Sequence, residues 1–351
     1  MRIQNIKLRN FRNHQDTKLD FDGETTLIIG KNGAGKTNLL EAIHLLATTK
    51  SLHSKYDKEM ISHDKKFARI DANINPNGDK QKLELLITKS DKFENASSKK
   101  VKLDKVARSL NNFAGTLNTV LFTPHDVELF TASPSIRRKY LDALFFQIDK
   151  KYKRATSQYT KAVRQRNKIL EQIRDFGTGK NQLEYWDEKV IETGTIIQNS
   201  RDDYFDFVQK IINTHIDTLS SEDTTCEIIY NKSEINPDAL KESQDTEIRA
   251  GRTLIGPHRD DFSINYNNHD IARYGSRGQK RTTILALKLC EIDFINKYLD
   301  RRPILLLDDI FSELDEGHKD AVTNSFDLQQ TIITSAEPIN MGKAIHLINI
   351  G

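Results

Sequence analysis

The sequence predicts an α/β fold built on a parallel sheet and interrupted by a mostly helical lobe. Three observations predict it. A glycine-rich loop at 30–37 lies between an apolar run and a helical pattern. A second apolar run, at 304–307, ends in two aspartates, and two segments with heptad spacing lie between these motifs in the chain. At 351 residues the chain can form one large or two medium domains.

The loop at 30–37 reads GKNGAGKT and fits the phosphate-loop pattern G-x-x-x-x-G-K-[ST] at every fixed position. The run 26–29 is rich in strand formers, and 38–46 has helical spacing. The alternative is a glycine-rich turn that matches the pattern by chance, and such a turn need not lie between a strand and a helix. The pattern indicates a nucleoside triphosphate site, with Lys36 reaching the β- and γ-phosphates and Thr37 ligating Mg²⁺. We expect the ligand to be held by Gly30, Lys31, Asn32, Gly33, Ala34, Gly35, Lys36, Thr37 and Asn38.

The run "ILLLDD" (304–309) is typical of a strand buried on both faces of a parallel sheet. Its aspartates follow at the carboxyl end of the strand, where open α/β sheets bind ligands. We assign Asp308 to Mg²⁺ and Asp309 to orienting or deprotonating the attacking water. The alternative is a buried strand followed by a solvated acidic turn.

A second phosphate-type loop precedes the apolar helix that follows residue 276. Ser276, Gly278 and Gln279 lie at the predicted helix N-terminus, which suits an anion. One sheet has a single place for one triphosphate, so this loop is expected to serve the nucleotide of a neighbouring subunit. A Gly-Ser turn capping an ordinary helix is the alternative. Together these motifs predict Asp309, Lys36 and Ser276 as catalytic residues and Thr37 and Asp308 as metal ligands.

These motifs resemble the ATPase heads of the ABC/SMC class and, more narrowly, the bacterial RecF family of recombinational-repair ATPases. The resemblance runs essentially end to end, in the family's order and spacing. It is carried by KLRNFRNHQ, IIGKNGAGKTNLLEAIHLL, VLFTPHDVELFTASPSIRRKYLD, RQRNKIL, GPHRDDF, YGSRGQKRTTILALKL and LLLDDIFSELD.

The resemblance implies a role for each matching residue. Lys36 and Thr37 are the Walker A pair, and Asp308 and Asp309 are the Walker B carboxylates. Ser276, Gly278 and Gln279 form the signature that would meet the γ-phosphate bound by the partner. Residues 312–315 match the D-loop, and Thr334 or Ser335 lies at the γ-phosphate sensor position. His125 lies in the Q-loop region where an acidic residue is expected, so the coupling residue is unassigned.

The motif positions predict a discontinuous ABC/SMC/Rad50-like head, formed by 1–105 and 250–351, with a helical lobe at 106–249. Within that lobe, heptad spacing predicts an antiparallel hairpin over about 151–213. An arm of about 25 residues at 1.5 Å each would be roughly 40 Å long, far shorter than the arms of SMC-type proteins. The polar stretch 231–247 is expected to be a loosely ordered connection.

Charge is unevenly placed. Residues 136–174 hold twelve Lys/Arg and three Asp/Glu, against a net charge of +3 for the whole chain. This asymmetry indicates a surface for a polyanion, most simply the backbone of duplex DNA, although a solvated helix face is the alternative. The candidates are Arg137, Arg138, Lys139, Lys150, Lys151, Lys153, Arg154, Lys161, Arg164 and Arg166, with Lys50, Lys55 and Lys58 next in line.

The segment at 1–15 has no apolar signal-peptide region, no run approaches the length of a membrane span, and there are only two cysteines. We therefore expect a cytoplasmic protein without membrane partners. The resemblance implies a weak, DNA-stimulated ATPase that uses ATP and Mg²⁺, forms an ATP-dependent homodimer on double-stranded DNA and single-strand/double-strand junctions, and works with RecR- and RecO-type proteins to load recombinase. The alternatives are another SMC/Rad50-like or ABC-class ATPase subunit, such as that of a transporter, or a purely structural scaffold.

Overall fold

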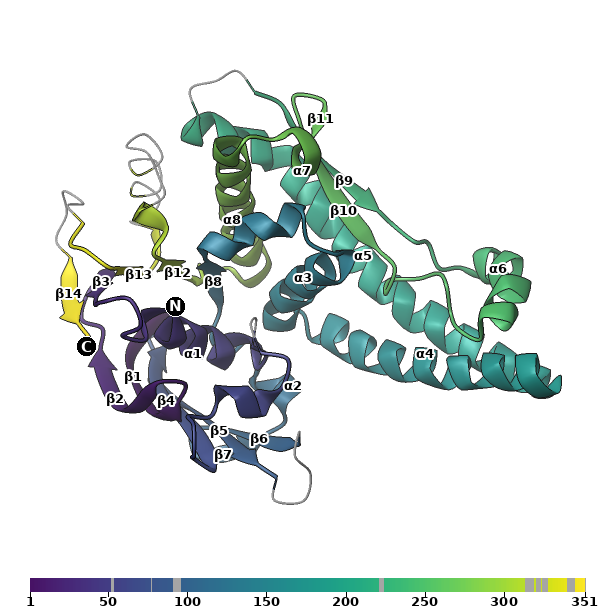
Figure 1. The fold of residues 1–351 in the computed structure, drawn as a ribbon, viewed down its shortest axis with the longest axis horizontal. Helices are drawn as coiled ribbons and strands as arrows, with labels where there is room; N and C mark the ends of the chain where they lie inside the picture. The colour runs from purple at the N-terminus through teal and green to yellow at the C-terminus, as the bar shows by residue number, and fades with distance from the viewer. Residues whose placement is uncertain are drawn as a thin grey trace. The chain divides into compact units, whose positions relative to one another are not determined.

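The computed structural model describes residues 1–51, 54–76, 78–90, 96–220, 224–312, 319, 323, 328–339 and 345–350 (Figure 1). The chain divides into two compact units. The first comprises Met1–Val127, Thr214–Asp223 and Arg281–Gly351, and the second comprises Glu128–Asn213 and Thr224–Lys280.

These limits differ from the expected domain boundaries at three places, one of which is Thr214–Asp223, a part of the expected helical lobe that lies in the first unit. Residues 106–127 lie in the first unit because they supply β8 (Thr119–Phe122), an edge strand of its parallel sheet. Residues 250–280 lie in the second unit because β10 (Asp261–Tyr266) pairs there with β9 (Cys226–Asn231). Neither pairing partner is near in sequence, so local composition does not reveal it.

A five-stranded sheet of order β14-β3-β13-β12-β8 forms one layer of the first unit, and every neighbouring pair in it is parallel. Its central strands are fully buried, as the continuous apolar runs predict. Besides β8, the strands are β3 (Thr25–Ile29), β12 (Ile304–Asp308), β13 (Thr331–Ser335) and β14 (His346–Asn349).

An antiparallel sheet of order β2-β1-β4-β5-β6-β7 forms the other layer. Strands β4 and β5 alternate between buried and half-buried residues, which is typical of a sheet with one face against the core. The strands are β1 (Arg2–Phe11), β2 (His14–Asp20), β4 (Phe67–Asn75), β5 (Gln81–Lys89), β6 (Ser97–Leu103) and β7 (Val106–Arg108).

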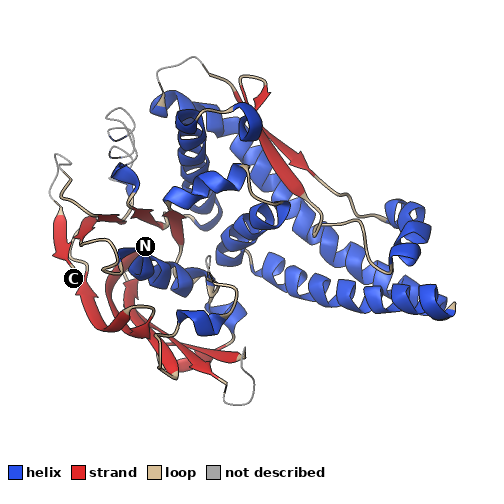
Figure 2. Ribbon diagram, viewed as in Figure 1, coloured by secondary structure: helices blue, strands red, loops and turns tan. Residues whose placement is uncertain are grey.

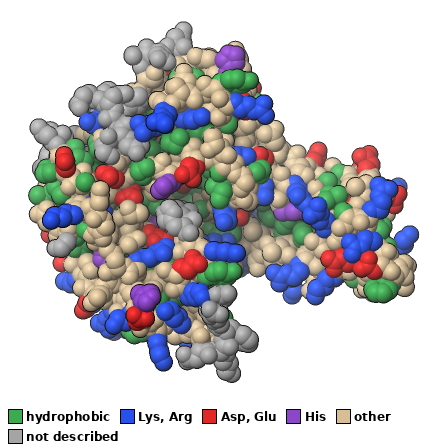
Figure 3. All heavy atoms as spheres, in the orientation of Figure 1, with side chains coloured by type: hydrophobic (Ala, Val, Ile, Leu, Met, Phe, Trp, Pro, Cys, Tyr) green, Lys and Arg blue, Asp and Glu red, His purple; other side chains and the backbone are tan. Residues whose placement is uncertain are grey.

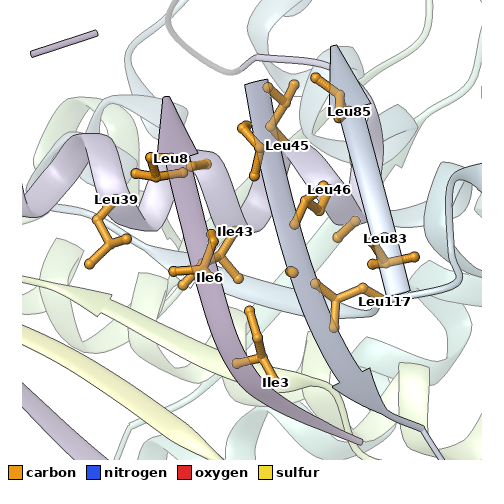
Figure 4. Close-up of a cluster of buried hydrophobic side chains, with 14 of the residues drawn as sticks. Ile3, Ile6, Leu8, Leu39, Ile43, Leu45, Leu46, Leu83, Leu85 and Leu117 are labelled. Atoms are coloured by element: carbon orange, nitrogen blue, oxygen red, sulfur yellow. The ribbon is translucent and has the colours of Figure 1, made fainter. Parts of the chain in front are cut away.

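Helix α1 (Lys36–Thr48) is buried on nearly all sides because its apolar residues pack against both sheets. Figure 4 shows Leu39, Ile43 and Leu46 of α1 among side chains of β1 and β5. The same core continues into the parallel sheet through Ile304 and Ile332. The helix that follows the glycine-rich loop is therefore held firmly in place.

The first unit also contains most of helix α8 and several short elements. Helix α8 (Arg277–Leu299) begins in the second unit and continues into the first. The short elements are η1 (Asp57–Met60), α2 (Leu110–Phe113), η2 (Pro124–Phe130) and η3 (Ile310–Ser312).

The second unit is mostly helical, as the ribbon coloured by secondary structure shows (Figure 2). Helix α4 (Lys150–Phe176) and helix α5 (Lys180–Leu219) form the predicted hairpin, and α5 runs on into the first unit. The heptad positions of α4 are buried, from Tyr152 to Ile173. A cross-helix ion pair between Arg166 and Asp187, 2.6 Å, fixes the antiparallel register.

The stretch expected to be loosely ordered contains a helix, α6 (Pro237–Ala250), so that expectation was wrong. The side chain of Asn236 accepts a hydrogen bond from the N–H of Ala239, Pro237 occupies the first turn, and Gly251 ends the helix. These are ordinary start and stop signals. The rest of the second unit consists of α3 (Pro134–Ile148), β9, β10, β11 (His269–Asp270) and α7 (Ile271–Tyr274). Within the described ranges, no helix is long and apolar enough to cross a membrane.

Candidate nucleotide-binding site

The glycine-rich loop joins β3 to α1, in the strand–loop–helix context that the sequence predicts. Gly33 and Gly35 have φ angles of +86° and +105°, in the left-handed region that favours glycine. A Cβ atom added at Gly33 would meet nothing within 4 Å. The loop therefore has an open side on which a ligand can approach the backbone closely.

The base of the loop packs against the neighbouring strands. A Cβ atom at Gly30 would lie 2.4 Å from the carbonyl oxygen of Ile350. The N–H of Gly30 donates to the carbonyl of Ser335, 3.3 Å, and the N–H of Ile350 donates to the carbonyl of Ile29, 2.9 Å. Glycine is required at position 30 because any larger residue would displace the chain beyond β14.

Lys36 is the first residue of α1, and its side chain lies back over the loop. Its ammonium donates to the carbonyl oxygens of Gly30, 2.6 Å, and Lys31, 3.2 Å. Thr37 is exposed on the same helical turn, where the helix dipole favours negative charge. Both side chains are therefore placed for a phosphate group seated at the N-terminus of α1.

The two aspartates lie at the same edge of the parallel sheet as the loop. Strand β13 lies between β3 and β12, and Thr334 pairs in register with both Ile28 and Asp308. The Thr334 hydroxyl donates to Oδ1 of Asp308, 2.7 Å, and both side chains are buried. The N–H of Asp309 lies 3.1 Å from both the carbonyl and the hydroxyl oxygen of Thr334. Thr334, expected at the sensor position, therefore holds the Walker B segment.

The residues at this edge fit a magnesium ion. Among the described residues, no group of three or more His, Cys, Asp or Glu side chains could enclose a metal. Mg²⁺ is usually bound by one or two carboxylates together with phosphate oxygens and water. The Asp308 carboxylate and the Thr37 hydroxyl provide this type of incomplete oxygen set.

The signature residues lie at the N-terminus of α8, and the first of them caps that helix. The hydroxyl of Ser276 accepts from the N–H of Gln279, 3.2 Å, and the amide oxygen of Gln279 accepts from the N–H of Ser276, 2.9 Å. This reciprocal pair is a capping box. Ser276 and Gly278 are exposed on the second unit. The helix-cap alternative is therefore correct for the local structure. Because the hydroxyl of Ser276 is exposed, it can also contact a ligand.

Sequence reasoning gave no role to the turn between β1 and β2, which contacts the loop. Arg12 forms a bidentate ion pair with Glu41 of α1, both contacts 2.9 Å, and Asn13 and His14 hydrogen-bond to Gly33 and Gly35. The only sequence signal was the family-like motif at 7–15. The contact joins segments about 20 residues apart, so neither segment shows it alone.

The structure describes the predicted Q-loop region but only the first residue of the predicted D-loop. Residues 313–315 of the D-loop lie outside the described part of the chain. In the Q-loop region, His125 lies on η2, and the acidic side chain next to it is Asp126. That carboxylate accepts from the N–H of Thr123, 2.5 Å, and lies 3.5 Å from the ammonium of Lys288 on α8.

Two of the ten basic candidates for a DNA surface, Arg166 and Lys153, are buried in the second unit, which contradicts the surface position expected of them, and two more are half-buried and bonded within that unit. Arg166 is fully buried and pairs with Asp187 and, at 2.7 Å, with Glu247. The other three are Arg137, which pairs with Asp261; Arg138, which donates to the carbonyl of Asp260; and Lys153, which is buried. Burial lowers the pKa of Lys153 to about 8. The remaining six candidates are exposed: Lys139, Lys150, Lys151, Arg154, Lys161 and Arg164.

The GPHRDDF motif at 256–262 is explained by Asp260, which is fully buried. Its carboxylate accepts from Arg201 and Gln198, both 2.9 Å, from the N–H of Ser233, 2.9 Å, and from the hydroxyl of Tyr230. A buried carboxylate with four donors is satisfied and locks the surrounding chain. This motif therefore has a structural role.

Comparison with known proteins gives matches over the whole chain. The family model described as RecF/RecN/SMC N terminal domain matches residues 2–350. The chain is 34% identical to the DNA replication and repair protein RecF of Bacillus thuringiensis (strain Al Hakam) and to that of Bacillus cereus (strain AH187), over 99% of this chain and 97% of each relative.

Solved structures give the same result. The recombination mediator protein RecF-ATP of the RecFOR pathway is 32% identical, with a TM-score of 0.87 over 96% of this chain and 92% of that one. The RecF-ATPrS structure is 31% identical, with a TM-score of 0.86 over 99% and 98%. An Smc head bound to the C-winged helix domain of ScpA matches at 16% identity and a TM-score of 0.55, which shows the fold alone. The predicted fold class, an SMC-type head with a P-loop, is confirmed.

Proposed function

Because the chain belongs to the RecF family, we propose that it is an ATP-dependent DNA-binding protein of recombinational repair and replication-fork maintenance. The observation that carries the proposal is the meeting of the glycine-rich loop with Asp308 and Asp309 at one edge of a parallel sheet. A site with these parts binds and hydrolyses a nucleoside triphosphate. The proposed activity is a weak ATPase stimulated by DNA.

Each side chain at this edge has a role that its geometry supports. Lys36 exchanges its contacts with the carbonyls of Gly30 and Lys31 for β- and γ-phosphate oxygens. Thr37 and Asp308 would hold Mg²⁺, which when bound neutralises phosphate charge. Asp309 orients the attacking water, with its backbone fixed by Thr334.

The signature loop supports an ATP-dependent homodimer. The strand–loop–helix element at 25–48 already supplies one phosphate site to the parallel sheet, and Ser276 and Gly278 form a second, exposed anion-type loop in the other unit. We assign the second loop to the γ-phosphate held by a second copy of the chain. ATP then joins two copies, and hydrolysis releases them.

For the DNA surface we propose the outer face of α4. Five exposed cationic side chains recur there at intervals of four, seven, three and four residues, on the face opposite the buried seam, and we call them the α4 stripe: Lys150, Arg154, Lys161, Arg164 and Lys168. The space-filling view shows Lys and Arg side chains over this helix (Figure 3). The stripe spans 18 residues, roughly 27 Å or about eight base pairs of duplex. Contacts of this kind would read the phosphate backbone, without base specificity.

The proposed partners are double-stranded DNA, single-strand/double-strand junctions and RecR- and RecO-type proteins, in the cytoplasm. The matching RecF structures are of recombination mediator proteins of the RecFOR pathway. We propose that the closed dimer on DNA helps to load recombinase there.

One experiment tests the proposal. Light scattering should show a monomer without nucleotide and a dimer with ATP and Mg²⁺, and duplex DNA binding should require ATP. Lys36→Ala should abolish both effects, and Lys80→Ala serves as a matched control because Lys80 is an exposed lysine of the same unit outside the loop. A chain that binds duplex DNA equally with and without ATP, or that remains monomeric with ATP, contradicts the proposal.

A further inference from the structure

The turn between β1 and β2 contacts the glycine-rich loop by two hydrogen bonds and the first turn of α1 by a third. The side-chain amide of Asn13 donates to the carbonyl of Gly33, 3.1 Å, and accepts from the side-chain amide of Asn38, 2.8 Å. Nε2 of His14 lies 3.0 Å from the carbonyl oxygen of Gly35. Two of the three loop glycines are therefore held from outside the loop.

The geometry requires a hydrogen on Nε2 of His14. A carbonyl oxygen only accepts, so Nε2 must carry the hydrogen that bonds to Gly35. The other ring nitrogen, Nδ1, lies 3.1 Å from the hydroxyl of Thr17. The side chain is 5% exposed, and burial lowers the pKa of the imidazole. A neutral ring with hydrogen on Nε2 satisfies both contacts.

The loop and the turn are in close contact. A Cβ atom at Gly35 would lie 2.6 Å from Oδ1 of Asn13 and 2.7 Å from Nε2 of His14. The space that a side chain at position 35 would occupy is therefore already filled by the turn. Glycine is favoured at position 35 for two reasons: it leaves room for the turn, and it readily adopts the φ angle of +105°.

Holding a carbonyl also orients the amide on the other side of the same peptide. In a trans peptide the C=O and N–H point in opposite directions. The carbonyl of Gly35 accepts from the N–H of Leu39 in α1, 2.9 Å, and from Nε2 of His14, so the helix and the turn together direct the N–H of Lys36 away from them. That N–H is one of the helix N-terminal donors that a phosphate group uses.

We propose that Asn13 and His14 are positioning residues that keep the loop in its phosphate-binding form before nucleotide arrives. This inference rests on the proposed nucleotide site. The antiparallel sheet, through its β1–β2 turn, would then contribute directly to ATP affinity.

The test is the affinity of the full-length protein for ATP, measured by calorimetry, together with KM and kcat. His14→Phe keeps the ring and removes the donor, and Asn13→Ala removes the amide. Each should raise Kd and KM about three- to tenfold with little change in kcat, because each removes one neutral hydrogen bond to the loop; Asn13→Ala also removes the bond to Asn38. His14→Gln places an amide nitrogen near the position of Nε2 and should restore affinity to within about twofold of wild type.

The matched control is Asn73→Ala. Asn73 donates to Asn5 on β1, 2.9 Å, so this variant removes a similar amide pair from the same sheet away from the loop. It should leave Kd unchanged, which separates positioning from general loss of stability. Unchanged Kd in both His14→Phe and Asn13→Ala, with wild type binding ATP, would overturn the inference and leave the proposed function intact. Failure of the wild type itself to bind ATP would overturn both.

Discussion

Replacement of Arg166 by Met should destabilise the second unit without touching DNA binding. Arg166 is fully buried between Asp187 and Glu247, at 2.6 and 2.7 Å, and its third nitrogen donates to the hydroxyl of Thr253, 3.0 Å. Glu247 is also fully buried. Its other oxygen accepts only from the backbone N–H of Leu254 among the hydrogen bonds described, at 2.7 Å.

Removing the guanidinium leaves the Glu247 carboxylate buried without its cation. Breaking one partner of a buried pair costs about 3–5 kcal/mol, because the remaining charge stays out of water. Met fills most of the side-chain volume, so packing loss adds little. We therefore expect the free energy of unfolding of the Arg166→Met variant to fall by about 3–5 kcal/mol. Adding Glu247→Gln removes the unpaired charge and should recover part of this loss.

Urea unfolding followed by circular dichroism measures the effect, and Arg164→Met is the matched control. Arg164 lies two residues away on α4 and is exposed, so its loss should change stability by less than about 0.5 kcal/mol. In a salt titration of duplex binding, Arg164→Met should have the larger effect of the two variants. Arg164→Met should lower the log–log slope by about 0.9 for one lost phosphate contact, and folded Arg166→Met should not. Equal stability of the two variants would refute the reasoning about the buried pair.

Four further outcomes are expected. Ser276→Arg should bind ATP as a monomer but fail to dimerise in light scattering, and normal dimerisation would reject the signature assignment. Asp309→Asn should keep ATP and Mg²⁺ bound while turnover slows and the dimer persists, whereas Asp308→Asn should weaken Mg²⁺-dependent binding; equal defects in both would reject the division of roles. Reversing the five charges of the α4 stripe to Glu should weaken ATP-dependent duplex binding and flatten its salt slope without changing dimerisation, and an unchanged slope would move the DNA surface elsewhere, first to Lys50, Lys55 and Lys58. Burial lowers the pKa of His258 below its usual 6.5, so its neutral form stabilises the fold above about pH 6.5 and this contribution is lost as the pH falls further. Chemical unfolding between pH 7.5 and 5 should show a smaller decline in stability for His258→Gln than for wild type.

The parts of the site that were predictable are those whose signals are local. The loop at 30–37 and the run 304–309 each carry their chemistry and their structural context within about fifteen residues, and β3, α1 and β12 form where those contexts predict them. Helix α6 was missed although its signals are also local. Its polar composition outweighed the Asn236–Pro237 start and the Gly251 stop.

The parts that were not predictable depend on contacts between distant segments. Arg166 falls on the buried seam of α4 and was still counted as a surface cation, because its partner Glu247 lies on another helix. The contacts of Asn13 and His14 with the loop likewise exist only once β1 and α1 pack together. Burial of a charged or polar side chain follows from the partner that satisfies it, and a single sequence does not identify that partner.

The pairing of β3 has a consequence for the order in which the protein is completed on the ribosome. Strand β3, at residues 25–29, pairs only with β13 and β14 in the parallel sheet, and these strands are at residues 331–349. At about 5–20 residues per second, the first strand waits tens of seconds for its neighbours to be synthesised. The second unit, between residues 128 and 280, leaves the ribosome during that interval. The nucleotide edge is therefore assembled last, and in a nascent chain interrupted before residue 331 the glycine-rich loop has the antiparallel sheet beside it but not the parallel strands that neighbour β3.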